Sequence, residues 1–183
     1  MPTCLIDTNH SSAEFAVRHM MVTWVVGLFT KIAGTLSFEP LNVAASAVEV
    51  EIDAAAIYTG VEQRDNHLKS EDFLDVARYP TFTFKSSRVE PAGLDHAWMH
   101  GDLTIRGITQ PVLLDVRWAG PARFDDEGKI YVSYGFRAET RINREDFGMT
   151  FNTELENDGF MVGKHVYLTI NAEVDLAEEQ VGG

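Results

Sequence analysis

Cysteine, basic residues and long apolar stretches are all scarce in this sequence. Cys4 is the only cysteine, so no disulfide can form within one chain and nothing points to an oxidising compartment. Lysine and arginine together number 15 against 28 aspartates and glutamates, which gives a formal net charge of -13. Such a charge repels phosphate backbones and anionic lipid headgroups. We therefore expect neither nucleic acid nor a bilayer surface as a partner.

The longest uncharged apolar run, residues 20–29, is too short to span a bilayer and contains Thr23 and Gly27. Membrane insertion is therefore not expected. Residues 1–12 show no basic segment, no apolar stretch of signal-peptide length and no small-residue cleavage site. This indicates a cytoplasmic protein, or a periplasmic one if a leader has been removed.

Motifs for metal, nucleotide or nucleophilic chemistry are absent from the sequence. No pair of histidines has HxH or HExxH spacing, no GxSxG is present, and a single cysteine excludes the usual zinc arrays. We expect no cofactor and no metal, although a metal site assembled across strands stays open. His10 is expected to hold its loop by a hydrogen bond to Asp7 or Ser12 rather than to act in catalysis.

Alternation of apolar and polar residues dominates the chain and predicts strands with one buried face. In the stretch 166–176, Val166, Leu168 and Ile170 begin an apolar row and Tyr167 and Thr169 begin the polar row opposite. The ranges 48–53, 112–118 and 130–142 repeat this pattern, and further strands are expected at 3–6, 12–17, 27–39, 81–89 and 97–106. The chain is therefore predicted to be all-β, with antiparallel strands joined by short loops.

The period of two does not distinguish a closed barrel from a sandwich. Chain length favours a barrel of about eight strands, which encloses a cavity for one small ligand. Short helical pieces are expected at 60–69, where Thr59 and Glu62 form a capping box, after Ser70, across 19–23 and at Asn143. We expect them to plug or rim one end. A single domain over 1–177 and a flexible tail over 178–183 complete the prediction.

Four phrases spread along the chain carry a family resemblance. They are DTNHSSAEFAVRHMMVTWVVG at 7–27, TGVEQRDNHLKSEDFLDVARYP at 59–80, GDLTIRGITQPV at 101–112 and INREDFG at 142–148. Their order and wording resemble the YceI-like family of polyisoprenoid-binding proteins over residues 3–176. Members of that family are lipocalin-like antiparallel barrels that hold a long isoprenoid or fatty chain inside. The resemblance therefore implies both a fold and a ligand class.

The predicted ligand-binding residues are large apolar side chains expected to point inward, methionines near strand ends, and cationic side chains near the rims. Thioethers adapt to irregular ligands, although filling gaps in a core is an equally good role for them. A solidly packed core is likewise the alternative for each aromatic residue. The predicted set is Phe15, Val17, His19, Met20, Phe29, Arg64, His67, Phe82, Phe84, Phe136, Arg144, Phe147 and Met149.

A polar head would need cationic partners at the rim. Arg64 and His67 share a helix face at i, i+3 and could meet a diphosphate or carboxylate through charge-assisted hydrogen bonds. The alternative is that Arg64 pairs with Asp65 or Asp72. A second candidate rim contains Arg18, His19 and Arg144.

The sequence thus predicts noncatalytic binding, transport or storage of a polyisoprenoid or similar long-chain lipid. At ~0.8 kcal/mol per buried methylene, fifteen carbons offer on the order of 12 kcal/mol. A homodimer sharing one long tail stays open, and so do two other classes of function. One is a barrel that is packed solid and acts through its surface. The other is an enzyme for a prenyl or quinone-like substrate that uses His19 or His67 with Glu14, Asp65 or Asp72.

Overall fold

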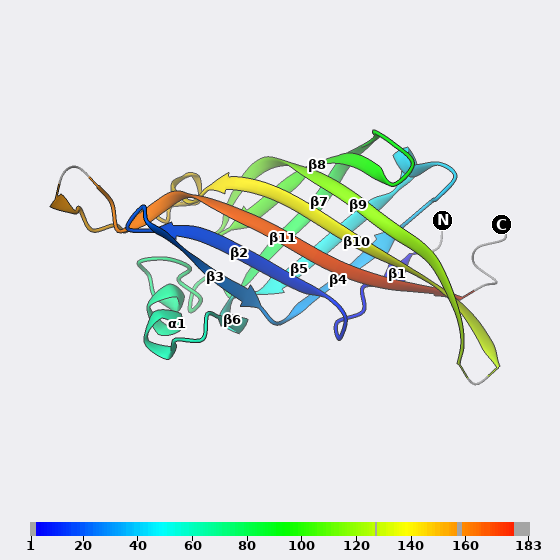
Figure 1. The fold of residues 1–183 in the computed structure, drawn as a ribbon, viewed down its shortest axis with the longest axis horizontal. Coiled ribbons are helices and arrows are strands. Elements are labelled where there is room, and N and C mark those ends of the chain that lie inside the picture. Colours follow the sequence, from blue (N-terminus) through cyan, green and yellow to red (C-terminus); the bar gives the residue numbers. More distant parts are fainter. Residues whose placement is uncertain (1–2, 127, 157–158, 178–183) are drawn as a thin grey trace.

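The computed structural model describes residues 3–126, 128–156 and 159–177. In this part of the chain, eleven antiparallel strands form one sheet in the order β1-β4-β5-β7-β8-β9-β10-β11-β2-β3-β6. The sheet curls around a long axis, with the helix α1 at one end (Figure 1). The strands are β1 (Cys4–Leu5), β2 (Ser12–His19), β3 (Thr23–Phe29), β4 (Ile32–Ser37), β5 (Ala47–Asp53), β6 (Ile57–Tyr58), β7 (Thr81–Pro91), β8 (His96–Ile105), β9 (Ile108–Asp126), β10 (Lys129–Asn143) and β11 (Val162–Ala177).

The segment that follows β1 joins the two sides of the curled sheet. The backbone amide of Ile6 donates to the carbonyl of Gly34 in β4 at 3.0 Å, and the amide of Asp7 donates to the carbonyl of Glu173 in β11 at 2.8 Å. Ile6 also forms an isolated antiparallel bridge with Val174. The edge strand β1 and the segment after it are therefore connected to β11, which lies toward the other side of the sheet, and this connection closes the curled sheet as a barrel requires.

The predicted all-β class is confirmed, whereas the predicted number of about eight strands is too low. The expected strand at 27–39 is divided into β3 and β4. The first pairs with β2 and the second with β5, and the chain changes its pairing partner at Thr30 and Lys31. The amide of Thr30 donates to the carbonyl of Ala56, and the carbonyl of Lys31 accepts from Asp53. Two-residue strands β1 and β6 add to the number.

Helical structure is confined to short pieces among the described residues. The α-helix α1 covers Glu62–Lys69, and three 3-10 helices cover Val43–Ala45 (η1), Ala54–Ala56 (η2) and Arg144–Phe147 (η3). The side chain of Asn143 accepts a hydrogen bond from the amide of Glu145, so the expected cap at this residue is present. Residues 20–22 form a hairpin turn between β2 and β3, with Met20 and Met21 in the left-handed region, so a turn is present within 19–23 but it is not helical.

The predicted capping box of Thr59 is wrong. Val61 precedes the first helical residue and makes no side-chain cap. Thr59 instead donates through both its amide and its hydroxyl to the carboxylate of Asp65, which is one turn into α1. A buried carboxylate close by thus competes successfully with the helix N-terminus for the threonine hydroxyl.

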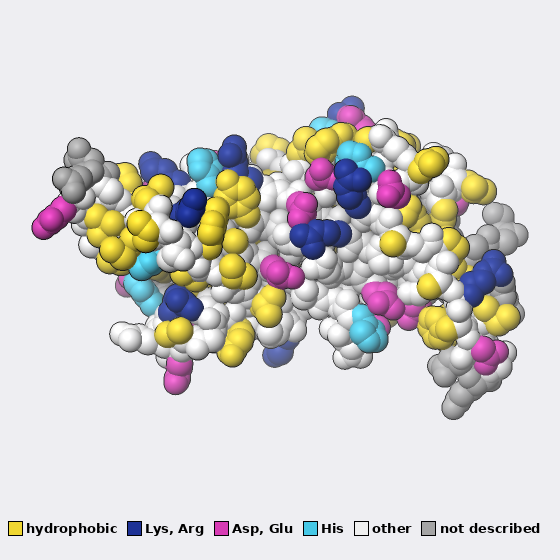
Figure 2. All heavy atoms as spheres, in the orientation of Figure 1, with side chains coloured by type: hydrophobic (Ala, Val, Ile, Leu, Met, Phe, Trp, Pro, Cys, Tyr) yellow, Lys and Arg dark blue, Asp and Glu magenta, His cyan; other side chains and the backbone are white. Residues whose placement is uncertain are grey.

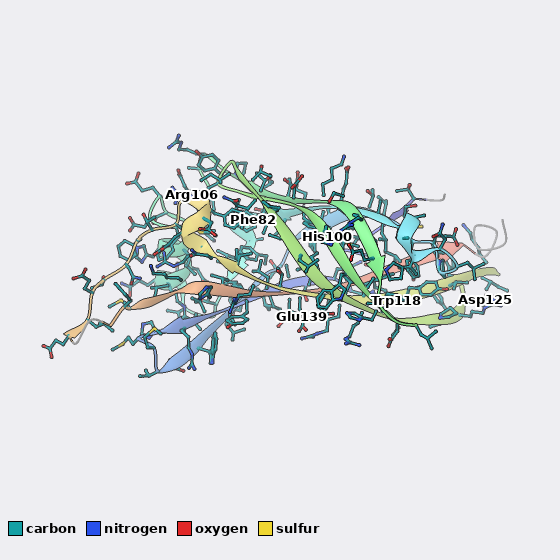
Figure 3. The ribbon with its side chains drawn as sticks, turned by 90° about the horizontal axis from the view of Figure 1, so that it is seen from above. Phe82, His100, Arg106, Trp118, Asp125 and Glu139 are labelled. Carbon is teal, nitrogen blue, oxygen red and sulfur yellow. The ribbon has the colours of Figure 1, made fainter. Side chains whose placement is uncertain are left out.

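The apolar core contains three groups of side chains distributed along the barrel. The first lies at the end near α1 and includes Phe29, Phe73, Phe82 and Phe147. Phe38 belongs to the second group, which β1, β4, β10 and β11 surround, and the third lies between β7, β8 and β9. Figure 3 shows Arg106 toward one end of the long axis and Trp118 and Asp125 toward the other. The predicted tail at 178–183 lies outside the described residues.

Candidate functional site

A cavity of about 210 Å³ lies inside the barrel. One buried water needs only about 10–15 Å³. The interior is therefore not completely filled by the side chains of the protein. The residues that line the cavity are Ile6, Ala13, Glu14, Phe15, Val17, Phe29, Leu36, Val48, Val50, Ile52, Ile57, Leu68, Phe73, Leu74, Phe82, Phe84, Met99, Leu103, Ile105, Val112, Leu114, Val116, Phe136, Ala138, Thr140, Ile142, Arg144, Met149, Val162, Val166, Leu168, Ile170 and Ala172.

The alternation of each strand positions this lining. On β11, Val166, Leu168, Ile170 and Ala172 all face the cavity, and Tyr167 lies exposed between them. Successive side chains on a strand point to opposite faces, so one buried row from each strand is enough to cover the interior. The result is an aliphatic and aromatic wall. Among the described lining residues, only Glu14, Thr140 and Arg144 are polar.

Arg144 is the buried cation of this wall, with 2% of its surface exposed. Its Nε donates to the carbonyl of Gly163 at 2.9 Å, one Nη donates to the carbonyl of Met149, and the other reaches the carbonyl of Val162 at 3.3 Å. Burial lowers the pKa of the guanidinium from its usual range, an effect that the carboxylate of Glu145 opposes. An arginine remains charged despite such a shift.

No ion pair with a carboxylate involves Arg144 among the described residues. Glu145, its neighbour in sequence, pairs instead with Lys164 at 3.2 Å. A guanidinium has five N–H donors, and the three carbonyl acceptors leave two donors without an assigned partner. The site therefore combines a long apolar cavity with one buried positive charge near the end that α1 occupies.

The segment containing α1 covers that end of the cavity. Leu68 on the helix and Phe73 and Leu74 in the turn after it are lining residues. The guanidinium of Arg106, in the β8–β9 turn, donates to the carbonyls of Phe73 and Glu71 and so fixes the turn. Leu68, Phe73 and Leu74 were not among the ligand-binding residues predicted from the sequence. The available signal was the apolar pair 73–74 shortly after the expected helix.

Eight of the thirteen predicted ligand-binding residues line the cavity, and their binding role stays a prediction. The eight are Phe15, Val17, Phe29, Phe82, Phe84, Phe136, Arg144 and Met149.

The other five predicted residues lie elsewhere. Phe147 is buried in the core at 1% exposure, because η3 turns it against neighbouring side chains. Met20 is exposed on the β2–β3 turn, and His19 pairs with Val162 at the end of β2. Arg64 donates to the hydroxyl and carbonyl of Thr59, and His67 lies 2.8 Å from the carboxylate of Asp72.

Titratable groups with shifted pKa values lie mostly away from the cavity. Burial raises the pKa of the Cys4 thiol. His10 is 2.7 Å from Asp7, as the sequence predicted, and this hydrogen bond raises the pKa of His10 and lowers that of Asp7. The described residues contain no cluster of three or more His, Cys, Asp or Glu side chains suited to a metal ion. They also contain no helix with the length and apolar character needed to cross a bilayer.

Comparison with known proteins identifies the family. The YceI-like domain matches residues 5–174. The chain belongs to the YceI-like family. Protein YceI of Escherichia coli O157:H7 is 37% identical over 143 residues, which span 78% of this chain and 73% of that protein.

Solved structures share the fold of this YceI-like chain. BcnA of Burkholderia cenocepacia superposes with a TM-score of 0.80 at 23% identity, covering 92% of this chain and 98% of BcnA. A polyisoprenoid-binding domain from Saccharophagus degradans, implicated in plant cell wall breakdown, gives a TM-score of 0.65 at 12% identity and covers 93% of this chain and 97% of that domain. At these identities the likeness concerns the fold alone.

Proposed function

We propose that this protein binds a polyisoprenoid or similar long-chain amphiphilic lipid inside the barrel, noncatalytically, for transport or storage. The observation that carries the proposal is the elongated apolar cavity of about 210 Å³. Membership of the YceI-like family and the shared fold of a polyisoprenoid-binding domain support it.

Affinity in such a cavity comes from burying methylene groups. Each contributes ~0.8 kcal/mol, so a dozen buried carbons offer on the order of 10 kcal/mol before the flexible chain is immobilised. Several kcal/mol of this gain is lost to ordering, which leaves roughly 6 kcal/mol, or a Kd on the order of tens of micromolar, and each further buried methylene tightens binding about fourfold. Selection then follows the length and shape of the tail, and a tail longer than the cavity protrudes from it.

The polar head of the ligand is assigned to Arg144. The other predicted cations at this end, Arg64 and His67, already have partners in Thr59 and Asp72. The two unassigned N–H donors of Arg144 suit an acceptor such as a carboxylate, a phosphate or a quinone carbonyl. An acceptor of negative charge would also compensate the buried cation.

The test is to purify the protein without detergent, extract it with organic solvent and identify the extract by mass spectrometry. A long-chain lipid in stoichiometric amount is the expected result. Protein stripped of lipid should also take up a pyrene-labelled fatty acid. A stripped, folded protein that takes up no probe, together with a lipid-free extract, would show that the barrel is not a lipid carrier.

Neighbouring residues on β10 provide a blocked variant and its matched control. Ala138 lines the cavity, whereas Arg137 is exposed on the opposite face of the same strand. Ala138→Phe should fill part of the cavity and reduce uptake of the probe, and Arg137→Phe should not. Equal uptake by the two folded variants would place the lipid outside this cavity.

No specific observation favours the enzyme alternative, because His19 and His67 do not line the cavity. Conversion of a prenyl or quinone-like compound by the pure protein would overturn the noncatalytic assignment. A cytoplasmic location and a homodimer remain predictions from the sequence.

A further inference from the structure

The β2–β3 hairpin exposes a group of large apolar side chains on its turn and on its outer face. Val22 is 77% exposed and Met21 is 57% exposed at the turn. Solvent exposure of so many large apolar residues together marks an interaction surface more often than isolated exposed residues do. We call this surface the end patch, and it contains Met20, Met21, Val22, Trp24, Val26 and Tyr167.

The end patch is continuous across three strands. The rings of Trp24 on β3 and Tyr167 on β11 meet edge to face, with 5.4 Å between centroids. Val26 and Tyr167 are both strand partners of Ala16 on β2, so they lie in one row across the sheet. Figure 2 shows hydrophobic side chains interleaved with cationic ones and histidines at the end of the molecule where this hairpin turns, with acidic side chains at the outermost tip.

The same hairpin also borders the lipid cavity. On the inner face of β2, Phe15 and Val17 line the cavity. Val162, which pairs with His19 at the last position of β2, lines it too. The cavity wall therefore reaches the base of the exposed turn.

Backbone geometry at the turn is unusual for the residues present. Met20 has φ 50° and Met21 has φ 62°, which is the left-handed region that glycine and asparagine occupy at low cost. Neither side chain is buried, so packing within the chain does not explain why methionines occupy these positions. Flexible thioethers held outward by a strained turn suit contact with an irregular apolar surface.

Charges around the end patch are mixed. The exposed Glu154 and Glu156 lie on the segment next to the turn, where the amide of Met20 donates to the carbonyl of Met161, and cations lie beside the aromatic rings. The guanidinium of Arg18 lies 4.5 Å from the centroid of the Trp24 ring, and Arg141 is the strand partner of Tyr167. Glu14, the carboxylate on this side of β2, lies farther from the turn and accepts from Asn171 at 3.2 Å. Because screening limits exposed charges to about 8 Å at physiological ionic strength, the acidic excess elsewhere does not decide what the end patch contacts.

We infer that the end patch docks the protein on the surface of a lipid bilayer, with the cavity next to the membrane. Tryptophan and tyrosine favour the interface between headgroups and acyl chains, and the turn supplies methionine and valine side chains to enter it. Arg18 and Arg141 then face the anionic headgroups. Transfer of a lipid between membrane and cavity rests on the proposed function, but docking itself does not.

The test uses vesicles of phosphatidylcholine with a minor fraction of phosphatidylglycerol and measures the protein that floats with them. The wild-type chain should float, and raised salt should weaken its binding. Met20→Asn with Met21→Gly removes two apolar side chains and gives the turn the residues it favours. Flotation should fall about tenfold or more, while the melting temperature stays equal or rises.

Two control variants make the result decisive. The first is Leu94→Asn, which should float like the wild type. Leu94 is fully exposed in the turn between β7 and β8, at the opposite end of the barrel. The cavity-blocked Ala138→Phe should also float, because its end patch is intact. If Ala138→Phe and the wild type float but neither holds lipid, the proposed function fails and docking stands.

Two results would overturn docking of the end patch on a bilayer. A wild-type chain that does not float, but whose dimer is lost in the Met20→Asn, Met21→Gly variant, would assign the patch to a second copy and overturn the inference. Equal flotation of this variant and the wild type would overturn it as well.

Discussion

The ring of Phe15 lies against Gly27, its partner on the neighbouring strand, so closely that a Cβ atom at Gly27 would overlap the ring. The space that the glycine leaves is used by an aromatic side chain of the protein. Gly101 accommodates the ring of Phe84 in the same way. Both rings line the cavity, so these two glycines help to set its width.

Gly27→Ala should push the Phe15 ring toward the cavity. We expect a loss of about 1–3 kcal/mol in the free energy of unfolding, the usual cost of overpacking a core. Urea unfolding measures this loss. Gly135→Ala is the control, because a Cβ atom at Gly135 meets nothing within 4 Å and stability should change by less than about 0.5 kcal/mol. Equal effects of the two substitutions would contradict the role given to Gly27.

Arg144→Met should destabilise the end of the barrel near α1. The substitution removes the donors from the carbonyls of Met149, Val162 and Gly163, at a cost of about 3 kcal/mol. Arg141→Met, an exposed change near the end of β10, three residues before Arg144, should cost less than about 0.5 kcal/mol. Thermal unfolding of the lipid-free variants compares them, and similar melting temperatures would be inconsistent with the three hydrogen bonds.

Thr59→Val should loosen α1 locally. The Thr59 hydroxyl donates to the buried carboxylate of Asp65 and accepts from Nε of Arg64, so its loss leaves both groups short of a partner at a cost of about 1–3 kcal/mol. Hydrogen exchange of the amides in Glu62–Lys69 should become about tenfold faster or more. Glu62→Gln, an exposed change in the same helix, should leave the exchange unchanged. Uniform acceleration over the whole chain would point to global destabilisation instead.

The His10–Asp7 pair should respond to pH in two directions. The hydrogen bond raises the pKa of His10 above 6.5, so its contribution to stability is complete below that pH and is lost as pH rises through the folded pKa. The pKa of Asp7 lies below 3.8, so its contribution is present above that pH and is lost as pH falls through the folded pKa. NMR titration of His10 should give a midpoint above 6.5, and Asp7→Asn should lower it. An unchanged midpoint would exclude the pairing in solution.

Alternation alone was sufficient to predict the main strands and their buried faces. Val174, on the apolar row predicted for 166–176, is completely buried, and Val166 to Ala172 on the same row face the cavity. Such rows are visible in a sequence because one face of each strand meets the interior and the other meets water. The family phrases added the ligand class, which no periodicity contains.

The remaining features depend on contacts between distant segments. Nothing local marks the interruption at Thr30 and Lys31, which arises because β3 belongs beside β2 whereas β4 belongs beside β5. The use of Gly27 and Gly101 to accommodate aromatic rings likewise depends on side chains of neighbouring strands. Arg64 was predicted to bind a ligand, but in the structure it donates to Thr59. This hydrogen bond was not predicted, because Thr59 was expected to cap the helix, which in fact starts only at Glu62.

The contact of Ile6 with Val174 brings together residues from nearly opposite ends of the chain. During synthesis on a ribosome, the N-terminal segment must therefore wait until almost the whole polypeptide has emerged before it finds this neighbour. Pairings over such long sequence separations form slowly, and open strand edges in the meantime invite aggregation. The nascent form should consequently benefit most from chaperones in the interval before the final strand is in place.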